Sequence, residues 1–387
     1  MSITRRALMR AGAMTAGLAM FPRPVLAAAA HDRPYGLITL AVSGVTTAVY
    51  RIDKRQLRDN ATASGYERLG LRRVDSSTTL VASSLQPGAD ETMIASAVEL
   101  VARNIASLKS DHDMRDKQIA IVGSSGLRSY VGPAVERLPA MLRERTGIGM
   151  RLLTSREEAQ LETDWIVPSD DREAVLHVEI GGADIKGGYY GREGRRRVYH
   201  DLAVPFGTRN FAGAVKFRYP SVRTDDFGAR AADHYREVIA PTIDRRLAAL
   251  PEALTRPKVY VSGGIAWATA VILHAQDMAL EKDWTRLSPD DFTTIRRLIE
   301  AGTPYGAGLP DSLTTAQRAS IRKTLGFIRN IFNPHQLAAG AAIGAGLAEQ
   351  LRFAGREAIL FPGFANGASS SQYLLYQITN NPEFRPS

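Results

Sequence analysis

The 387-residue chain contains no cysteine, which excludes disulfide bonds and thiol-based catalysis. It also lacks a G-x-S-x-G serine motif and an H-E-x-x-H zinc motif, and its seven histidines are scattered along the sequence. No low-complexity tract or long run of one charge interrupts the chain after residue 33. The sequence therefore has neither a disulfide scaffold nor a serine- or zinc-hydrolase motif.

A long hydrophobic segment is missing too. The N-terminal run TRRALMR, with Arg5 and Arg6, precedes an apolar stretch that Pro22 and Pro24 interrupt before the roughly 20 residues that a membrane span requires. Paired arginines before a short, alanine-rich stretch are typical of a twin-arginine export signal. We predict that residues 1–30 form this signal, and that the mature chain lies in the periplasm without a membrane anchor. The twin-arginine pathway exports proteins that have already folded. This fits a chain without cysteine, because no disulfide bond has to form after export.

The formal net charge of +9 overstates the charge of the mature chain. Arg5, Arg6, Arg10 and Arg23 belong to the predicted signal, so 45 basic and 40 acidic residues remain and the net charge falls to +5. A mild basic excess is compatible with a polyanionic partner but does not identify one.

Two parts of the chain show the same order of predicted elements. Three strands begin at residue 37 and lead into alternating helices and strands, and a second strand-and-hairpin series begins at residue 174. Such a duplication predicts an α/β fold of the two-lobed actin-like (ribonuclease H-like) ATPase superfold, with βββαβα lobes around a central cleft. We assign residues 31–160 to lobe I, joined by the C-terminal segment, and residues 161–387 to lobe II and the C-terminal helices.

The segment HVEIGGADIKGG contains the first candidate site. Glu179 ends an apolar strand, and Gly181 and Gly182 follow in a turn. Glycines allow the backbone to approach a phosphate, and a carboxylate at a strand end can hold Mg²⁺ or its water. An ordinary tight hairpin would have the same pattern, so the segment alone leaves both interpretations open.

Six segments resemble, in order, the conserved segments of the exopolyphosphatase/guanosine pentaphosphatase (Ppx/GppA) family. The match runs from about Leu37 to Gln377, and it marks the chain as similar to a divergent, exported member. The six segments are AIVGSSGLR, LLTSREEAQL, VEIGGAD, VPFGTRNF, VYVSGG and NPHQLAAGAAIGAGL.

The resemblance implies a hydrolase that releases phosphate from polyphosphate or a related phosphoanhydride. Glu158 would orient the attacking water, Arg128 would bind phosphate, and Glu179 would hold Mg²⁺. The remaining implied phosphate contacts are Ser43, Gly44, Gly181, Gly182, Gly207, Thr208, Ser262, Gly263 and Gly264.

Several positions depart from the family pattern. Leu40 occupies the place of a metal-binding aspartate in the first turn, and Asp184 replaces the serine of the second turn. A carboxylate there repels a polyanion unless a metal intervenes. The alternative is therefore a degenerate, non-catalytic member that binds an anionic ligand or a protein partner, while a phosphotransferase such as a sugar kinase fits less well.

Some candidate residues also have plain structural interpretations. Glu157 and Glu158 could be solvated acids in the first turn of a helix, and Arg195 to Arg197 could be an exposed hairpin edge. The partner expected is polyphosphate or another anionic phosphate ligand. No nucleic acid is expected, and a homodimer stays open.

Overall fold

The computed structural model describes residues 34–42, 44–52, 71–79, 85, 87–279, 284–303, 309–363 and 368–380. The predicted export signal and Ser43 lie outside these residues. Within the described ranges, no helix combines the length and the apolar character that crossing a membrane requires.

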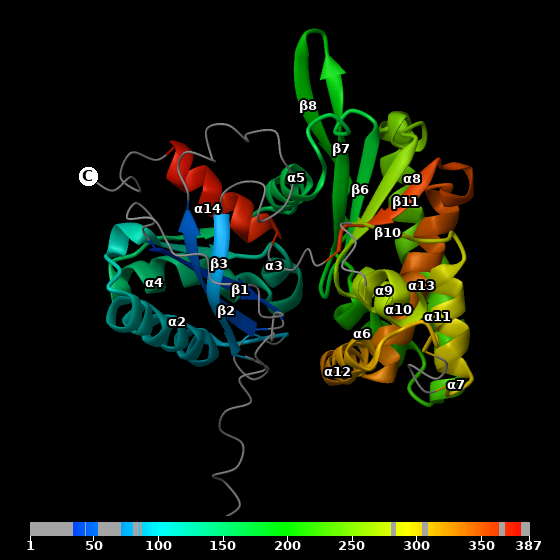
Figure 1. Cartoon of the computed structure of the whole chain (residues 1–387), viewed down its shortest axis with the longest axis horizontal. Coiled ribbons are helices and arrows are strands. Elements are labelled where there is room, and N and C mark those ends of the chain that lie inside the picture. Colours follow the sequence, from blue (N-terminus) through cyan, green and yellow to red (C-terminus); the bar gives the residue numbers. More distant parts are fainter. Residues whose placement is uncertain are drawn as a thin grey trace, which may run out of the picture.

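Two β-sheets, each with its own layers of helices, stand side by side (Figure 1). The first has the strand order β3-β2-β1-β4-β5, and the second has the order β10-β11-β9-β6-β7-β8. The predicted α/β fold class with two lobes is confirmed. The strands of the first sheet are β1 (Pro34–Ala41), β2 (Gly44–Ile52), β3 (Leu71–Thr79), β4 (Ile119–Gly123) and β5 (Met150–Leu152).

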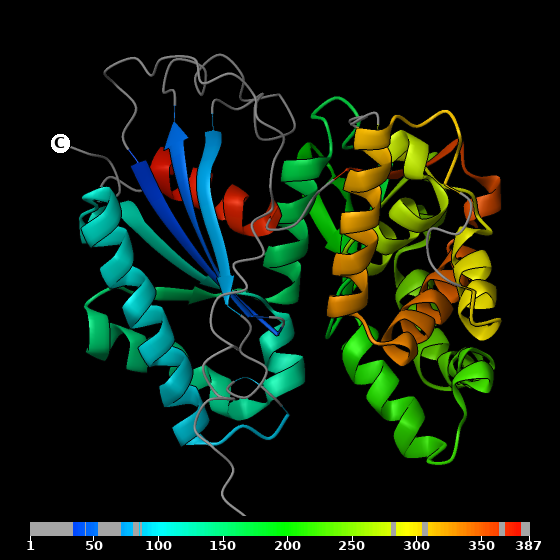
Figure 2. The ribbon, with the colours of Figure 1, turned by 60° about the horizontal axis from the view of Figure 1, so that its bottom comes forward.

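Alternation of apolar residues explains how the first sheet is covered on both faces. Ile38 and Leu40 of β1 pack with the helices of one face, whereas Leu37 packs on the other. Figure 2 shows α14 across one face and α2 across the opposite face. The helices around this sheet are α2 (Glu91–His112), α3 (Gly126–Val131), α4 (Leu138–Thr146), α5 (Ser155–Ile166) and α14 (Ala368–Asn380).

The second sheet begins after α5, and its strands β6 and β7 form an antiparallel hairpin. Its strands are β6 (Val175–Ile180), β7 (Ile185–Glu193), β8 (Arg196–Asp201), β9 (Lys258–Ser262), β10 (Thr285–Arg286) and β11 (Ala358–Phe361). Its helices are α6 (Thr208–Arg218), α7 (Thr224–His234), α8 (Ala240–Ala249), α9 (Gly264–Leu273), α10 (Ala275–Ala279), α11 (Asp291–Glu300), α12 (Thr315–Ile331) and α13 (Pro334–Gln350).

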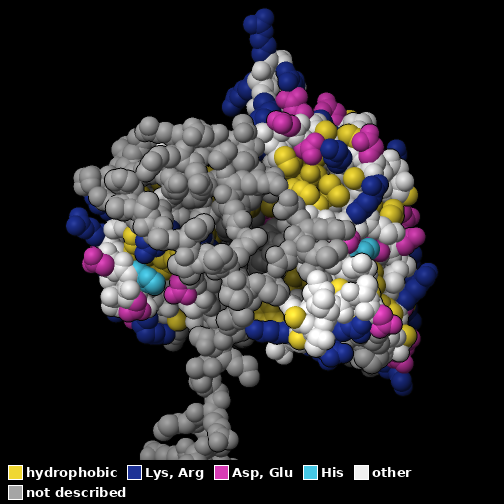
Figure 3. Space-filling view, in the orientation of Figure 1, with side chains coloured by type: hydrophobic (Ala, Val, Ile, Leu, Met, Phe, Trp, Pro, Cys, Tyr) yellow, Lys and Arg dark blue, Asp and Glu magenta, His cyan; other side chains and the backbone are white. Residues whose placement is uncertain are grey.

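The hairpin of β7 and β8 projects beyond the body of the molecule (Figure 1). Gly194 adopts a φ of 62° at its tip, a conformation that favours glycine. All side chains from Arg192 to Arg197 are exposed, and Figure 3 shows basic side chains at the end of the projection. The predicted exposed basic hairpin is therefore present.

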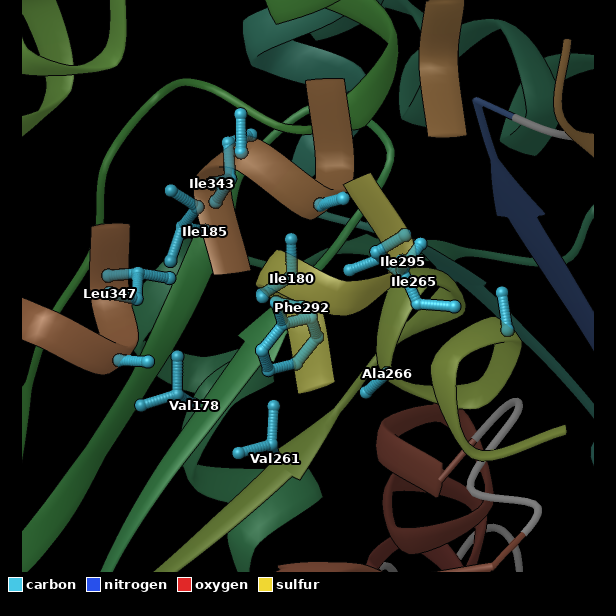
Figure 4. Packing of buried hydrophobic residues seen from close by; sticks show 14 of the residues in the cluster. Val178, Ile180, Ile185, Val261, Ile265, Ala266, Phe292, Ile295, Ile343 and Leu347 are labelled. Carbon is cyan, nitrogen blue, oxygen red and sulfur yellow. The ribbon is translucent and has the colours of Figure 1, made fainter. Parts of the chain in front are cut away.

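One face of β6 builds the core of the second lobe. Val178 and Ile180 pack toward Phe292 of α11 and Ile343 of α13 (Figure 4). His177 and Glu179 alternate with Val178 and Ile180 along β6. They necessarily point to the opposite face, because neighbouring side chains of a strand alternate. That opposite face is where α5 lies against β7 and where the candidate site forms.

Candidate functional site

Two glutamates of α5 face the second sheet. Glu158 and Glu162 are separated by four residues, which places them on one side of a helix, and both are buried. The adjacent Glu157 has a different role, because its carboxylate accepts hydrogen bonds from the backbone N–H and the hydroxyl of Thr154, both at 2.9 Å. Glu157 therefore caps α5, whereas the interpretation of Glu158 as a solvated acid is wrong.

Glu158 is held by the turn between β4 and α3. The backbone N–H of Ser125 donates to its Oε2 at 2.7 Å, and the hydroxyl of Ser124 donates to the same oxygen at 3.3 Å. Burial raises the pKa of Glu158, and this effect outweighs the opposing ammonium of Lys186. The side chain thus sits at a fixed position between the two lobes.

The hairpin of β6 and β7 places a lysine in contact with the carboxylate of Glu158. Lys186 pairs with Glu179 across the hairpin, so that the two side chains share one face. The Lys186 Nζ lies 2.8 Å from Glu179 Oε2 and 3.5 Å from Glu158 Oε2. Burial alone would lower the pKa of Lys186, but the surrounding carboxylates outweigh burial and raise that pKa well above its usual range. The ammonium is therefore charged and enclosed.

Asp184 completes the cluster from the turn between β6 and β7. Its Oδ1 accepts a hydrogen bond from the Lys186 ammonium at 3.0 Å, and its Oδ2 accepts one from the Ser125 hydroxyl at 2.8 Å. We call the place where the β4–α3 turn and α5 meet the β6–β7 hairpin the junction. Only 2% of Asp184 is exposed, so its side chain lies inside this junction and not at its edge. The bond to Ser125 joins the turn of the second sheet to the first sheet.

Backbone packing closes the same junction. A Cβ on Gly126 would lie 3.2 Å from the Cβ of Ala183, and a Cβ on Gly182 would lie 3.1 Å from a methyl group of Val42. The hairpin turns of the two lobes therefore meet in direct contact at this point, where the fold prediction had expected a central cleft.

A neutral hydrogen-bond chain lies behind the charged cluster. His177 is fully buried, and its two ring nitrogens lie 2.9 Å from the hydroxyls of Thr163 and Ser262. Ser262 in turn donates to Glu162 at 2.7 Å. Burial, with a smaller contribution from Lys186, lowers the pKa of His177 to about 3. Burial and Glu179 raise the pKa of Glu162 well above its usual range, which favours a protonated Glu162 beside a neutral His177.

Three of the predicted phosphate contacts, Arg128, Gly181 and Thr208, donate hydrogen bonds within the protein. Arg128 donates to Glu136 at 2.6 Å and to the carbonyl of Leu153, so its guanidinium ties α3 to the turn that follows it and to the segment between β5 and α5. The backbone N–H of Gly181 donates to the carbonyl of Asp184 at 3.0 Å, and that of Thr208 donates to the carbonyl of Gly181 at 2.9 Å. These donors already have partners within the chain.

The glycines after β9 have a packing role. Gly263 has a φ of 91°, and a Cβ on it would lie 2.3 Å from the carbonyl oxygen of Ile180. A Cβ on Gly264 would lie 2.8 Å from the ring of Phe332. Among the other candidates, Gly44 opens β2, and the N–H of Gly207 donates to the side chain of Asn210 at 2.7 Å.

The Mg²⁺ that the resemblance implies does not fit these residues. Glu179, the predicted ligand, contacts the ammonium of Lys186, which already occupies the centre of the carboxylates. Leu40 is fully buried and offers no oxygen from the first turn. In the part of the chain that the structure describes, no group of three or more acidic or histidine side chains is arranged to hold a metal ion.

Sequence reasoning missed the lysine, the second glutamate and the histidine. Two signals were available: Glu162 follows Glu158 at helical spacing, and Lys186 follows Asp184 at the two-residue spacing of a strand. Their convergence on one point depends on the register of β6 and β7, which the sequence does not specify.

Comparison with known proteins identifies the fold. No family model and no curated protein matches the sequence. Among solved structures, a Ppx/GppA family member from Aquifex aeolicus aligns with 91% of this chain and 99% of its own, at 12% identity and a TM-score of 0.55. An exopolyphosphatase from Cytophaga hutchinsonii aligns with 89% of this chain and 98% of its own, at 15% identity and a TM-score of 0.56. The chain therefore has the fold of the Ppx/GppA exopolyphosphatases over most of its length.

Proposed function

We propose that this chain is a non-hydrolytic, anion-binding protein of the periplasm, built on the fold of the exopolyphosphatases. One observation carries the proposal: a buried ammonium and a buried aspartate fill the junction of the two lobes. The Lys186 Nζ lies 3.0 Å from Asp184 and 2.8 Å from Glu179. Both side chains lie among the residues for which the family resemblance implies contacts to phosphate and metal.

Electrostatics supports this proposal. Hydrolysis of a phosphoanhydride requires positive charge on the transferred phosphoryl oxygens. Even with Glu162 protonated, the carboxylates of Glu158, Glu179 and Asp184 outnumber the single ammonium of Lys186. The excess negative charge repels a polyanion, and Arg128 is neutralised by Glu136.

A turnover assay tests the proposal. The purified chain, incubated with long-chain polyphosphate and Mg²⁺, is expected to release phosphate no faster than its Glu158→Gln variant, because Glu158 has no bound phosphate to act upon. Phosphate is measured colorimetrically against a buffer blank. Release by the wild type at least about tenfold above the variant would overturn the proposal.

Hydrolysis remains a second candidate because of Glu158 itself. A general base works best with a pKa near the working pH, and the pKa of Glu158 is raised by burial. If the lobes opened and Lys186 moved aside, this carboxylate could orient water. The same assay distinguishes the two candidates.

The projecting β7–β8 hairpin is the surface that we propose for the anionic ligand. Arg197 lies over the ring of Tyr190, 4.4 Å from its centroid, and Arg192 pairs with Glu173 at 2.9 Å. Arg195 and Arg196 are exposed and pair with none of the residues placed by the structure. Two exposed guanidinium groups on this hairpin can contact phosphate oxygens in the bidentate way that arginine favours.

Replacing Arg195 and Arg196 by glutamate is expected to weaken binding of long-chain polyphosphate about tenfold at low salt, since each phosphate contact contributes to a salt-dependent affinity. Fluorescence anisotropy with labelled polyphosphate measures the change. The matched control is the Arg322→Glu/Lys323→Glu double variant, which makes the same charge change on exposed residues of α12. Equal weakening by both pairs would mean that net charge, and not the hairpin, determines binding.

A further inference from the structure

The strongest unexplained feature is the lysine at the centre of the junction. Lys186 is 2% exposed, and its ammonium lies within 3.5 Å of three carboxylates. These carboxylates come from a helix, a strand and a turn that converge at this point. We propose that the Lys186 ammonium replaces a divalent cation in this site, so that the junction is assembled without metal. The three carboxylates are not arranged to hold a metal ion while the ammonium lies among them, and Lys186→Ala is expected to let them close around one.

The donor set explains why a cation is needed here. Carboxylate oxygens of Glu158, Glu179 and Asp184 are hard ligands of the kind that Mg²⁺ and Mn²⁺ prefer. Without a cation, their mutual repulsion in a buried site would be severe. Lysine can supply that cation from within the chain because its ammonium is a compact point charge on a flexible stem.

The β6–β7 hairpin holds the Lys186 ammonium in the position that a metal ion would occupy. Lys186 and Glu179 are cross-strand partners, so backbone hydrogen bonds, and not a binding equilibrium, fix the ammonium among the oxygens. One side chain provides a single positive charge where Mg²⁺ would provide two. The hydrogen bond from Ser125 to Asp184 satisfies one of the remaining carboxylate oxygens.

The replacement also joins the lobes. The hydroxyl of Ser125 donates a hydrogen bond to Asp184, and the backbone N–H of Ser125 donates one to Glu158. Both carboxylates contact Lys186. The ammonium thereby stabilises contacts between the turn of the first sheet and the hairpin of the second. A metal-dependent junction would close only when metal is bound, whereas this junction is expected to stay closed in chelator.

The experiment compares metal binding by the full chain and three variants. Mn²⁺ is the probe, with bound and free ion separated by electron paramagnetic resonance, and melting temperature is recorded in chelator and in millimolar Mn²⁺. Lys186→Ala is expected to bind one Mn²⁺ per chain, at least about tenfold more tightly than the wild type, and to regain melting temperature on Mn²⁺ addition. The wild type and Lys186→Arg, which keeps the charge, are expected to show neither response.

Asp184→Asn/Lys186→Ala covers the case in which Lys186→Ala does not fold, because it removes one buried charge and retains Glu158 and Glu179. Mn²⁺-dependent folding of either variant supports the proposal. It is overturned if the wild type binds Mn²⁺ as tightly as the variants, or if neither variant responds to Mn²⁺. Because no turnover is measured, this inference can fail while the proposed lack of hydrolysis stands, and the reverse also holds.

Discussion

Replacing Lys186 by methionine is expected to lower the free energy of unfolding by about 3–5 kcal/mol, the cost of leaving a buried charge without its partner. Methionine matches the length of the lysine stem but leaves Glu179 and Asp184 without the ammonium that lies 2.8 and 3.0 Å away. In thermal unfolding this corresponds to a decrease in melting temperature of about 10 °C.

Two variants control this expectation. Lys186→Arg keeps the positive charge and should lose much less stability, although the larger guanidinium must fit a closed site. Asp184→Asn/Lys186→Met should be more stable than Lys186→Met alone, because it removes one of the stranded charges. A Lys186→Met protein as stable as the wild type would show that the network does not hold the junction together.

Acidification between pH 6.5 and pH 4.5 is expected to cost the folded state about 2 kcal/mol through His177 alone. Burial lowers the pKa of His177 to about 3 in the folded chain, from 6.5 when exposed. The unfolded chain therefore binds a proton first as the pH falls. The stability contributed by neutral His177 is complete above pH 6.5 and is lost progressively toward pH 3.

Glu158 and Glu162 act in the opposite direction. Burial raises the pKa of both in the folded chain, so the folded form takes up protons more readily than the unfolded form as the pH falls. The His177 contribution must therefore be isolated by comparing denaturant unfolding of the wild type with His177→Gln at several pH values. The difference between the two is expected to shrink or change sign on acidification, and a difference that does not vary with pH would contradict the role of His177.

Local sequence patterns predicted the fold well because each strand could be identified by itself. Alternating apolar residues located β1, β2 and β6, and the repetition of a hairpin after residue 174 indicated the second sheet. The limits of the strands could not be identified in this way: β3 continues to Thr79 because it pairs with β2.

The candidate site was only partly predictable. Glu158, Glu179 and Asp184 were identified individually, and they do lie together. Arg128 was expected beside them, but its guanidinium pairs with Glu136, which follows eight residues later and is exposed. Such a pairing depends on the path of the chain after α3 and leaves no signature in a motif.

The occupant of the junction in the presence of both metal and phosphate decides between a closed, non-hydrolytic site and a working active site. A crystal structure of the wild type grown with Mn²⁺ and tripolyphosphate, using the anomalous signal of manganese, tests this most directly. We expect Lys186 to remain in contact with Glu179 and Asp184, with no manganese or phosphate between the lobes. Manganese bound to Glu179, with phosphate beside Glu158 and Lys186 displaced, would contradict the account.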